Sequence, residues 1–101
     1  MARVRFTKPA IRDFAEIGSY IAKDNEIAAR DFVSRIKEKC YGISDAPYIG
    51  RLRDDYGHDV RSFPFSNYVI FYKPISSGIA VLRVIHGARD LTVAFQANRP
   101  L

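Results

Sequence analysis

The sequence is poor in the residues from which covalent and metal-bound sites are built. It contains one cysteine, Cys40, and two histidines, His58 and His86. One cysteine excludes an internal disulfide, and one thiol with two distant histidines does not match the ligand spacing of a zinc site. A Gly-rich phosphate-binding loop and a nucleophile motif are also missing. We therefore expect neither a metal nor a cofactor.

Long hydrophobic runs are missing as well. No stretch approaches the roughly 20 apolar residues of a membrane helix. The first residues, MARVRFTKPA, lack the apolar region of a signal peptide. These absences predict a cytoplasmic protein. A hydrophobic fraction of 48% in 101 residues is enough for the core of one domain, 1–101, and excludes disorder as a global description.

The charge balance is basic, with sixteen Lys and Arg against eleven Asp and Glu and a net charge of +5. A small basic domain attracts polyanions or acidic protein partners through its long-range field. The same excess also aids solubility, so charge alone does not decide between these interpretations.

The longest apolar runs lie within residues 58–90 and predict a β-hairpin. The segments 68–72 and 79–86 are rich in β-branched and aromatic residues, which favour strands. Between them, residues 73–78 contain proline, serine and glycine, which are typical of turns. Both faces of the two strands are apolar, so we expect other elements or a partner chain to pack on each face.

Two further strands are predicted. Residues 2–6 alternate between apolar and charged side chains, as in a short, half-buried strand. Residues 60–65 are interrupted by Pro64, which predicts a short strand or an edge strand because proline donates no ladder hydrogen bond.

Apolar residues at helical spacing predict helices over 8–23 and 26–44, the first with Thr7 as N-cap. The short break at Asp24-Asn25 predicts an antiparallel helical hairpin. Cys40 falls within the apolar stripe and is interpreted as a small core residue. The stripes consist of Ala10, Phe14, Ile17 and Ile21 in the first helix and Ala29, Val33, Ile36, Cys40 and Ile43 in the second.

The element order β-α-α-β-β-β predicts an α+β fold in which the N-terminal helical hairpin packs on a small antiparallel sheet. Residues 88–95 are expected to form a last helical turn capped by Asp90, before a frayed tail over 96–101. Only this short segment is left for the second face of the sheet. We therefore expect a partner chain to cover most of that face.

Three basic residues near the hairpin form the candidate for catalysis. Arg61 precedes the hairpin, Arg83 lies in its second strand and His86 at its exit. A metal-independent ribonuclease needs a base that titrates near neutrality and cations that face the phosphate. Each residue has a structural alternative: Arg83 paired with a carboxylate, Arg61 as a solvated edge cation, and His86 as a hydrogen-bonded strand-end residue.

Four segments occur in order along nearly the whole chain: YIAKDNEIAARDFVSRI, PYIGRLRDD, VRSFPFSNYVIFYK and VLRVIHGARD. Together they resemble the ParE group of the RelE/ParE toxin superfamily, and VLRVIHGARD is the most specific of them. The resemblance implies the toxin of a type II toxin–antitoxin system with the fold described above. It implies DNA gyrase as the target and a ParD-like antitoxin whose C-terminal helix and tail wrap the toxin. It further implies a hetero-oligomer that meets DNA only through the antitoxin.

RelE-type members of the superfamily are ribosome-dependent messenger-RNA endonucleases, and several end in a histidine or tyrosine near strand arginines. Here His86 is followed by Gly87-Ala88-Arg89-Asp90 instead. This departure favours a toxin that binds and disables its target without catalysis. The alternative is a metal-independent endoribonuclease that uses Arg61, Arg83 and His86. A third hypothesis is an inert toxin-like protein that acts only in DNA-bound autoregulation with its antitoxin.

For the binding hypothesis we expect affinity to be concentrated in a few arginine and aromatic anchors. Arg89 and Phe95 lie on a segment that the core is expected not to require. The predicted target- and antitoxin-binding residues are Arg61, Arg83, His86, Arg89, Asp90 and Phe95.

Overall fold

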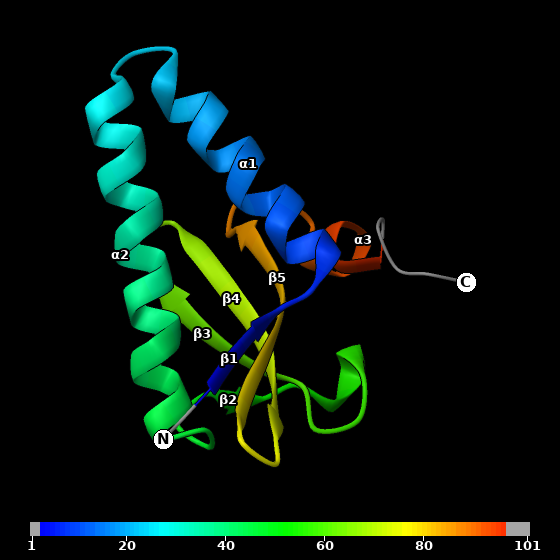
Figure 1. The fold of residues 1–101 in the computed structure, drawn as a ribbon. Helices are drawn as coiled ribbons and strands as arrows, with labels where there is room; N and C mark the ends of the chain where they lie inside the picture. The colour runs from blue at the N-terminus through cyan, green and yellow to red at the C-terminus, as the bar shows by residue number, and fades with distance from the viewer. Residues whose placement is uncertain (1–2, 97–101) are drawn as a thin grey trace.

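A computed structural model describes residues 3–96 and has a helical hairpin layered on a five-stranded sheet (Figure 1). This confirms the predicted α+β class. No helix within the described residues is long and apolar enough to cross a membrane. In chain order the elements are β1 (Arg3–Phe6), α1 (Lys8–Ala22), α2 (Glu26–Asp45), β2 (Arg51–Leu52), the 3-10 turn η1 (Asp54–Tyr56), β3 (Arg61–Phe65), β4 (Tyr68–Ile75), β5 (Gly78–His86) and α3 (Leu91–Gln96).

The sheet has the order β1-β5-β4-β3-β2 and is mixed, whereas an antiparallel sheet was expected. β1 runs parallel to β5, with Val4 opposite Ile79 and Phe6 opposite Val81. Parallel neighbours require a long crossover, and the helical hairpin lies in the connection between these two strands. The two-residue strand β2, which pairs with β3, was not predicted.

The turn between β4 and β5 is shorter than expected. It consists of residues 76–77 and not of 73–78, because β4 continues through Pro74. Proline is tolerated there because β3 pairs with β4 only as far as Tyr72. The missing N–H of Pro74 therefore faces no neighbouring strand.

Pro64 in β3 also lies where no neighbouring strand needs a backbone N–H. β2 pairs with β3 only at Arg61 and Ser62, so at Pro64 the outer side of β3 is the edge of the sheet. The predicted edge position of this proline is confirmed. Proline occurs at sheet edges because it has no backbone N–H to donate to a neighbouring strand.

The main core lies between the helical hairpin and one face of the sheet. Thr7 and Asn25 cap α1 and α2 through their side-chain oxygens, as Ser, Thr, Asp and Asn side chains commonly do. Cys40 is fully buried in the α2 stripe, and burial raises the pKa of its thiol to about 12. A neutral, enclosed thiol is an inert core residue. The buried helical residues of this core are Ala10, Phe14, Ile17, Ile36, Cys40 and Ile43.

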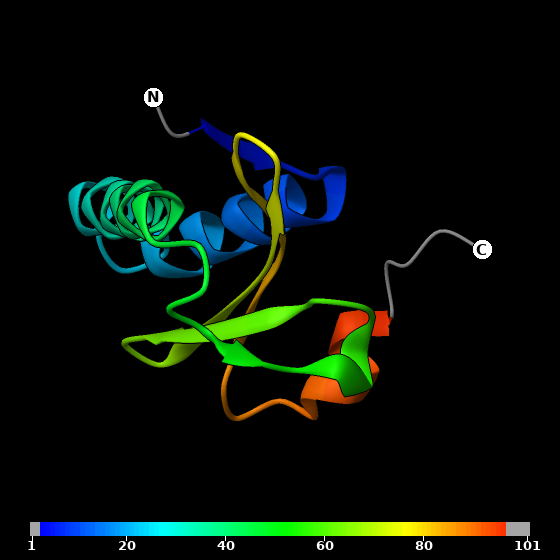
Figure 2. The same cartoon turned by 90° about the horizontal axis from the view of Figure 1, so that it is seen from below.

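A second, smaller core covers part of the opposite face of the sheet. Figure 2 shows α3 and the η1 segment on the side of the sheet away from the helical hairpin. The Phe95 ring packs edge-on against Phe71 and Tyr56, at centroid distances of 5.2 and 5.1 Å. The C-terminal segment was the one part of the chain expected to be left for this face, and it does cover part of it, together with η1. The expectation that the core does not require Phe95 is wrong, because this side chain is 7% exposed.

A buried ion pair joins the two layers to the sheet. Nε and Nη2 of Arg83 on β5 donate to the two carboxylate oxygens of Asp13 on α1, at 2.7 and 2.9 Å. Asp13 also accepts from the backbone N–H of Val84 at 2.8 Å. Nη1 of Arg83 donates to the carbonyl oxygens of Ala94 and Phe95 in α3. One guanidinium thus connects α1, β5 and α3.

Truncation of the α2 stripe should be costly. Ile36→Ala should destabilise the fold by roughly 2–5 kcal/mol, because it removes a buried side chain and leaves a cavity. Arg35→Ala, on the exposed side of the same helix, should cost less than about 0.5 kcal/mol. Urea denaturation measures both, and equal losses would contradict the placement of the stripe.

Removal of one partner of the buried pair should also be costly. Asp13→Leu should destabilise the fold by roughly 3–5 kcal/mol, because it leaves the Arg83 charge buried without a counter-ion. Asp55→Ala, in the exposed Arg53–Asp55 pair, should cost less than about 1 kcal/mol. In a double-mutant cycle, Asp13→Leu combined with Arg83→Met should cost less than the sum of the single changes. Additive losses would show that the pair is not coupled.

Candidate functional site

Arg83 is the first of the predicted site residues, and the structure places it inside the protein. Its side chain is 5% exposed and that of its partner Asp13 is 3% exposed. The interpretation of Arg83 as a strand arginine paired with a carboxylate is confirmed. The guanidinium is engaged by Asp13 and by carbonyl oxygens of α3, although the residue also borders the open pocket on the α3 side of the sheet.

Arg61 holds the loop that follows α2. Its Nη1 donates to the carbonyl oxygens of Gly50 at 3.0 Å and Tyr48 at 3.3 Å. Its guanidinium also lies 4.9 Å from the centre of the Tyr48 ring, and Nε is 3.8 Å from Asp59 Oδ1. The side chain is 17% exposed, so the expectation of a solvated edge cation is wrong.

Tyr72 holds the same loop from the core side, a role that the sequence analysis missed. Its hydroxyl donates to the carbonyl oxygen of Pro47 at 2.7 Å and accepts from the N–H of Gly50 at 2.8 Å. A Cβ at position 50 would lie 2.5 Å from this hydroxyl, which explains the glycine. Burial raises the pKa of Tyr72. The sequence contained a signal for this role, because a tyrosine in a buried strand needs a hydrogen-bond partner for its hydroxyl.

His86 lies at the end of β5 and is half-buried. Its Nδ1 accepts from the N–H of Ala88 at 3.1 Å, and its ring meets the Tyr68 ring edge-on at 5.1 Å. Neutral His86 therefore carries its proton on Nε2. The side chain lines an open pocket of about 330 Å³ together with Glu16 and Arg89.

The structure does not bring the proposed nuclease residues together. Arg61 pairs with Tyr72 and His86 pairs with Tyr68 on β4. These partners are four positions apart, or about 13 Å along the strand. Since the guanidinium of Arg83 is also engaged, Arg61 and Arg83 do not form a constellation of one base and two free cations with His86.

The remaining predicted residues differ in their roles. Arg89 is exposed beside His86. Asp90 caps α3, as predicted, with Oδ1 accepting from the N–H of Val93 at 3.2 Å. Phe95 is part of the second core. Gln96, which was assigned to the predicted frayed tail, is the last residue of α3. The rest of that tail, residues 97–101, lies outside the described part of the chain.

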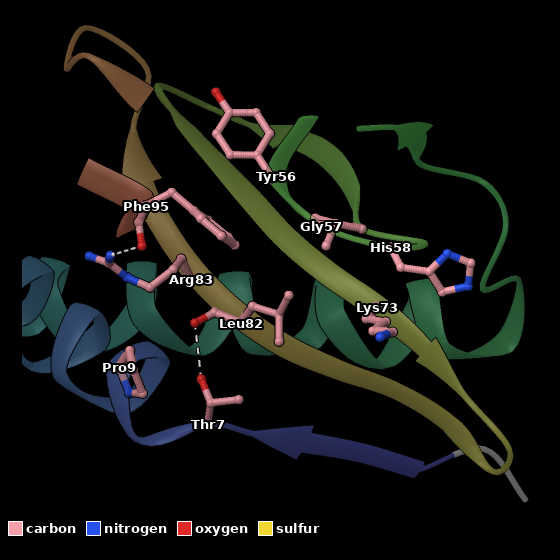
Figure 3. A pocket seen from close by; sticks show the side chains of 10 residues that line it. Thr7, Pro9, Tyr56, Gly57, His58, Lys73, Leu82, Arg83 and Phe95 are labelled. Atoms are coloured by element: carbon pink, nitrogen blue, oxygen red, sulfur yellow. Dashed lines mark hydrogen bonds between the residues drawn. The ribbon is translucent and has the colours of Figure 1, made fainter. Parts of the chain in front are cut away.

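A second open pocket, of about 400 Å³, lies on the sheet face that carries α3 (Figure 3). Leu82 forms part of its lining, with Thr7 and Pro9 on one side and Lys73 and His58 on the other. Within residues 3–96, no group of three His, Cys, Asp or Glu side chains could hold a metal ion. The sequence analysis did not single out Lys73, although it follows an otherwise apolar strand run.

Comparisons with known proteins agree with the fold. The family described as the ParE toxin of the type II toxin–antitoxin system parDE matches residues 4–91. A protein of Sinorhizobium fredii (strain NBRC 101917 / NGR234) that is named as a toxin, Y4kP, is 33% identical over 87 residues, which cover 83% of this chain and 86% of that protein. A solved structure, described as the chromosomal ParDE TA system from P. aeruginosa, superposes with a TM-score of 0.70.

That structure is 19% identical in sequence and covers 85% of this chain and 96% of its own, so it supports the fold. The family match covers most of the chain and includes every element from β1 to β5. The chain therefore belongs to the ParE toxin family of type II toxin–antitoxin systems.

Proposed function

We propose that this toxin inhibits DNA gyrase by binding it, and that a ParD-like antitoxin neutralises the toxin. Membership of the ParE family supports the target and the partner. The observation that favours binding over catalysis is the engagement of both candidate arginines. Arg83 is paired with Asp13 in the interior, and Arg61 is bound to the carbonyl oxygens of the 48–50 loop. Both guanidiniums already donate to internal oxygen atoms, although Nε of Arg61 makes no hydrogen bond within residues 3–96, and this disfavours a role in stabilising charge on a phosphate.

Arg89 and His86 are the proposed target-binding residues, with Asp90 next to them. Arg89 is exposed and lines the same pocket as the half-buried His86. An arginine at the edge of a partly apolar pocket is a common anchor of protein interfaces. Arg61, Arg83 and Phe95 are proposed to act indirectly, because they hold the loop, the sheet and α3 that surround such a surface.

A metal-independent endoribonuclease is the second candidate, and one observation favours it. His86 is half-buried and lines an open pocket, and Arg89 supplies a cation within the same pocket. General acid–base chemistry needs a group of this kind within reach of the substrate. The candidate lacks a second free cation, which is why we place it second.

The antitoxin is proposed to cover apolar side chains that the helical hairpin leaves in solvent. Burial of exposed apolar side chains is a major favourable contribution to association between proteins. The P. aeruginosa neighbour belongs to a ParDE system, in agreement with a partner of this kind. The complex is proposed to be a cytoplasmic hetero-oligomer that contacts DNA through the antitoxin. The exposed hairpin residues are Ile11, Tyr20, Ile27 and Tyr41.

The purified full chain should inhibit supercoiling by gyrase and increase the amount of cleaved DNA trapped with the enzyme. In a parallel assay with programmed ribosomes, messenger RNA should remain intact. The antitoxin, mixed with the toxin beforehand, should restore supercoiling. Cleavage of ribosome-bound messenger RNA with unaffected gyrase would contradict the proposal and support the second candidate.

Two neighbouring variants separate binding from base catalysis in these assays. His86→Gln keeps a polar side chain but cannot act as a base near neutral pH, so inhibition should stay within about tenfold, or ~1.4 kcal/mol. Arg89→Ala, from the same pocket, should weaken inhibition by more than about tenfold if it is an anchor. Circular dichroism verifies that both variants fold. A folded, non-toxic His86→Gln protein, beside a parent that cleaves messenger RNA, would contradict the binding mechanism.

The melting temperature of the toxin should rise with its antitoxin. A ligand that binds only the folded state at ~100 times its dissociation constant adds ~2.7 kcal/mol to the free energy of unfolding. Thermal scans should be run with the intact antitoxin and with one that lacks its C-terminal segment, which should have no effect. Equal melting temperatures with and without the intact antitoxin would contradict the partnership.

A further inference from the structure

The turn that follows α2 begins with local chemistry. Pro47 occupies the second position of a tight turn, which the N–H of Ile49 closes by donating to the carbonyl oxygen of Ala46 at 3.0 Å. Proline favours this position because its ring presets the backbone angle that such turns require. Figure 1 shows the segment at the end of α2 that lies away from the α1–α2 connection. Contacts from the sheet then fix its conformation.

The hydroxyl of Tyr72 and the guanidinium of Arg61 hold the backbone of this turn. Together they bind the N–H of Gly50 and three carbonyl oxygens between positions 47 and 50. Tyr72 is fully buried in the main core, and Arg61 lies opposite it on β3. A backbone that is already fixed in this way loses little conformational freedom when it binds a partner.

The apolar side chains on this fixed backbone face solvent. Tyr48, Ile49 and Leu52 are 67%, 60% and 47% exposed. Leu52 is the register partner of Arg61, whose guanidinium lies 4.9 Å from the centre of the Tyr48 ring, so both apolar side chains border the same arginine. Tyr48, Ile49 and Leu52 form the Tyr48 patch. Burial of exposed apolar side chains favours association, and tyrosine is a frequent anchor of protein interfaces.

The charges around the Tyr48 patch are balanced, although the chain as a whole carries +5. Residues 45–61 contain three arginines and four aspartates. Arg53 pairs with Asp55 at 3.5 Å, and Asp59 lies 3.8 Å from Arg61. A nucleic acid, which needs cations for its phosphates, therefore fits this patch poorly. An apolar, uncharged recess of a folded protein fits it better, because the centres of protein interfaces are depleted of charge and rich in aromatic residues.

We propose that the Tyr48 patch inserts into an apolar, uncharged recess of the protein that this toxin binds as its target. The inference rests on the proposed function in one respect, namely that the toxin acts by binding a protein. The patch lies at the Tyr72 end of β4, whereas His86 and the pocket with Arg89 lie at the Tyr68 end. The patch is therefore a second contact, separate from that pocket.

Substitutions of exposed side chains test the patch and leave the core intact. In the supercoiling assay, Ile49→Ser and Leu52→Ser should each raise the half-inhibitory toxin concentration by at least about fivefold, because each removes apolar surface from the contact. Tyr48→Ala should raise it by at least about tenfold. Val93→Ser removes an apolar side chain of α3 that is 65% exposed, and inhibition should stay within about twofold. Melting temperatures verify that the variants fold.

The salt dependence of these effects distinguishes an apolar contact from a charged one. The ratio of variant to parent should be the same at about 0.05 and 0.3 M salt, because salt screens charges and not apolar contacts. A variant effect that disappears at the higher salt concentration would overturn the apolar recess.

Tyr72→Phe tests whether the fixed backbone matters. It removes the hydroxyl that binds the turn and keeps every side chain of the Tyr48 patch, so inhibition should weaken by about threefold or more. The Gly50 amide should exchange its hydrogen faster in this variant. Tyr56→Phe also removes a buried tyrosine hydroxyl, which contacts Thr92 on the other face, and should leave both readouts unchanged. Faster exchange at Gly50 without weaker inhibition would overturn the role of preorganisation.

Growth of cells that express the toxin separates this inference from the choice of gyrase. If the parent arrests growth but leaves gyrase unaffected, gyrase is not the target, and the patch variants should still lose growth arrest while Val93→Ser keeps it. The inference is overturned if the patch variants act as strongly as the parent, or if the parent affects neither gyrase nor growth. It is also overturned if the variants lose only the antitoxin-induced rise in melting temperature, or only self-association in sedimentation.

Discussion

The buried pair of Asp13 and Arg83 is the interaction on which the arrangement of layers depends. Two charges that leave water are stabilised only when nearly all their hydrogen-bonding groups find partners. Here the carboxylate accepts from Arg83 and from the N–H of Val84, and the guanidinium also donates to carbonyl oxygens of α3. A shift of α1 relative to β5 would leave a buried charge unpaired, and a shift of α3 would leave Nη1 of Arg83 without its carbonyl acceptors. The pair therefore restricts the fold to one packing of both layers.

The same constraint bears on function. An arginine that neutralises an internal carboxylate is not available for a phosphate, and the Arg61 guanidinium is likewise bound to the loop after α2. The polar groups near His86 form a pocket with one exposed arginine. This arrangement agrees with the proposed inhibition by binding.

The two faces of the sheet offer different chemistry to partners. The helical hairpin packs on one face, and its outer surface exposes single large apolar side chains such as Tyr20 and Ile27. The other face is closed by α3 and η1 at one end and is basic and open at the other. Distinct surfaces of this kind allow a small protein to bind a target and a neutralising partner through different groups.

The sequence by itself determined the elements that depend on local chemistry. Periodicity and capping residues located α1 and α2, Asp90 was correctly placed as the cap of α3, and the proline rule placed Pro64 at an edge. The tertiary structure alone decided that β1 lies parallel to β5, that Arg83 pairs with a carboxylate seventy residues earlier, and that Phe95 is buried. These contacts join segments that are distant in the chain. Local sequence spacing does not indicate which strand pairs with a given strand edge, which carboxylate pairs with a given arginine, or which rings pack on a given aromatic side chain. Strand pairing likewise places Arg5 of β1 and Lys73 of β4 on the two sides of Ala80 in β5.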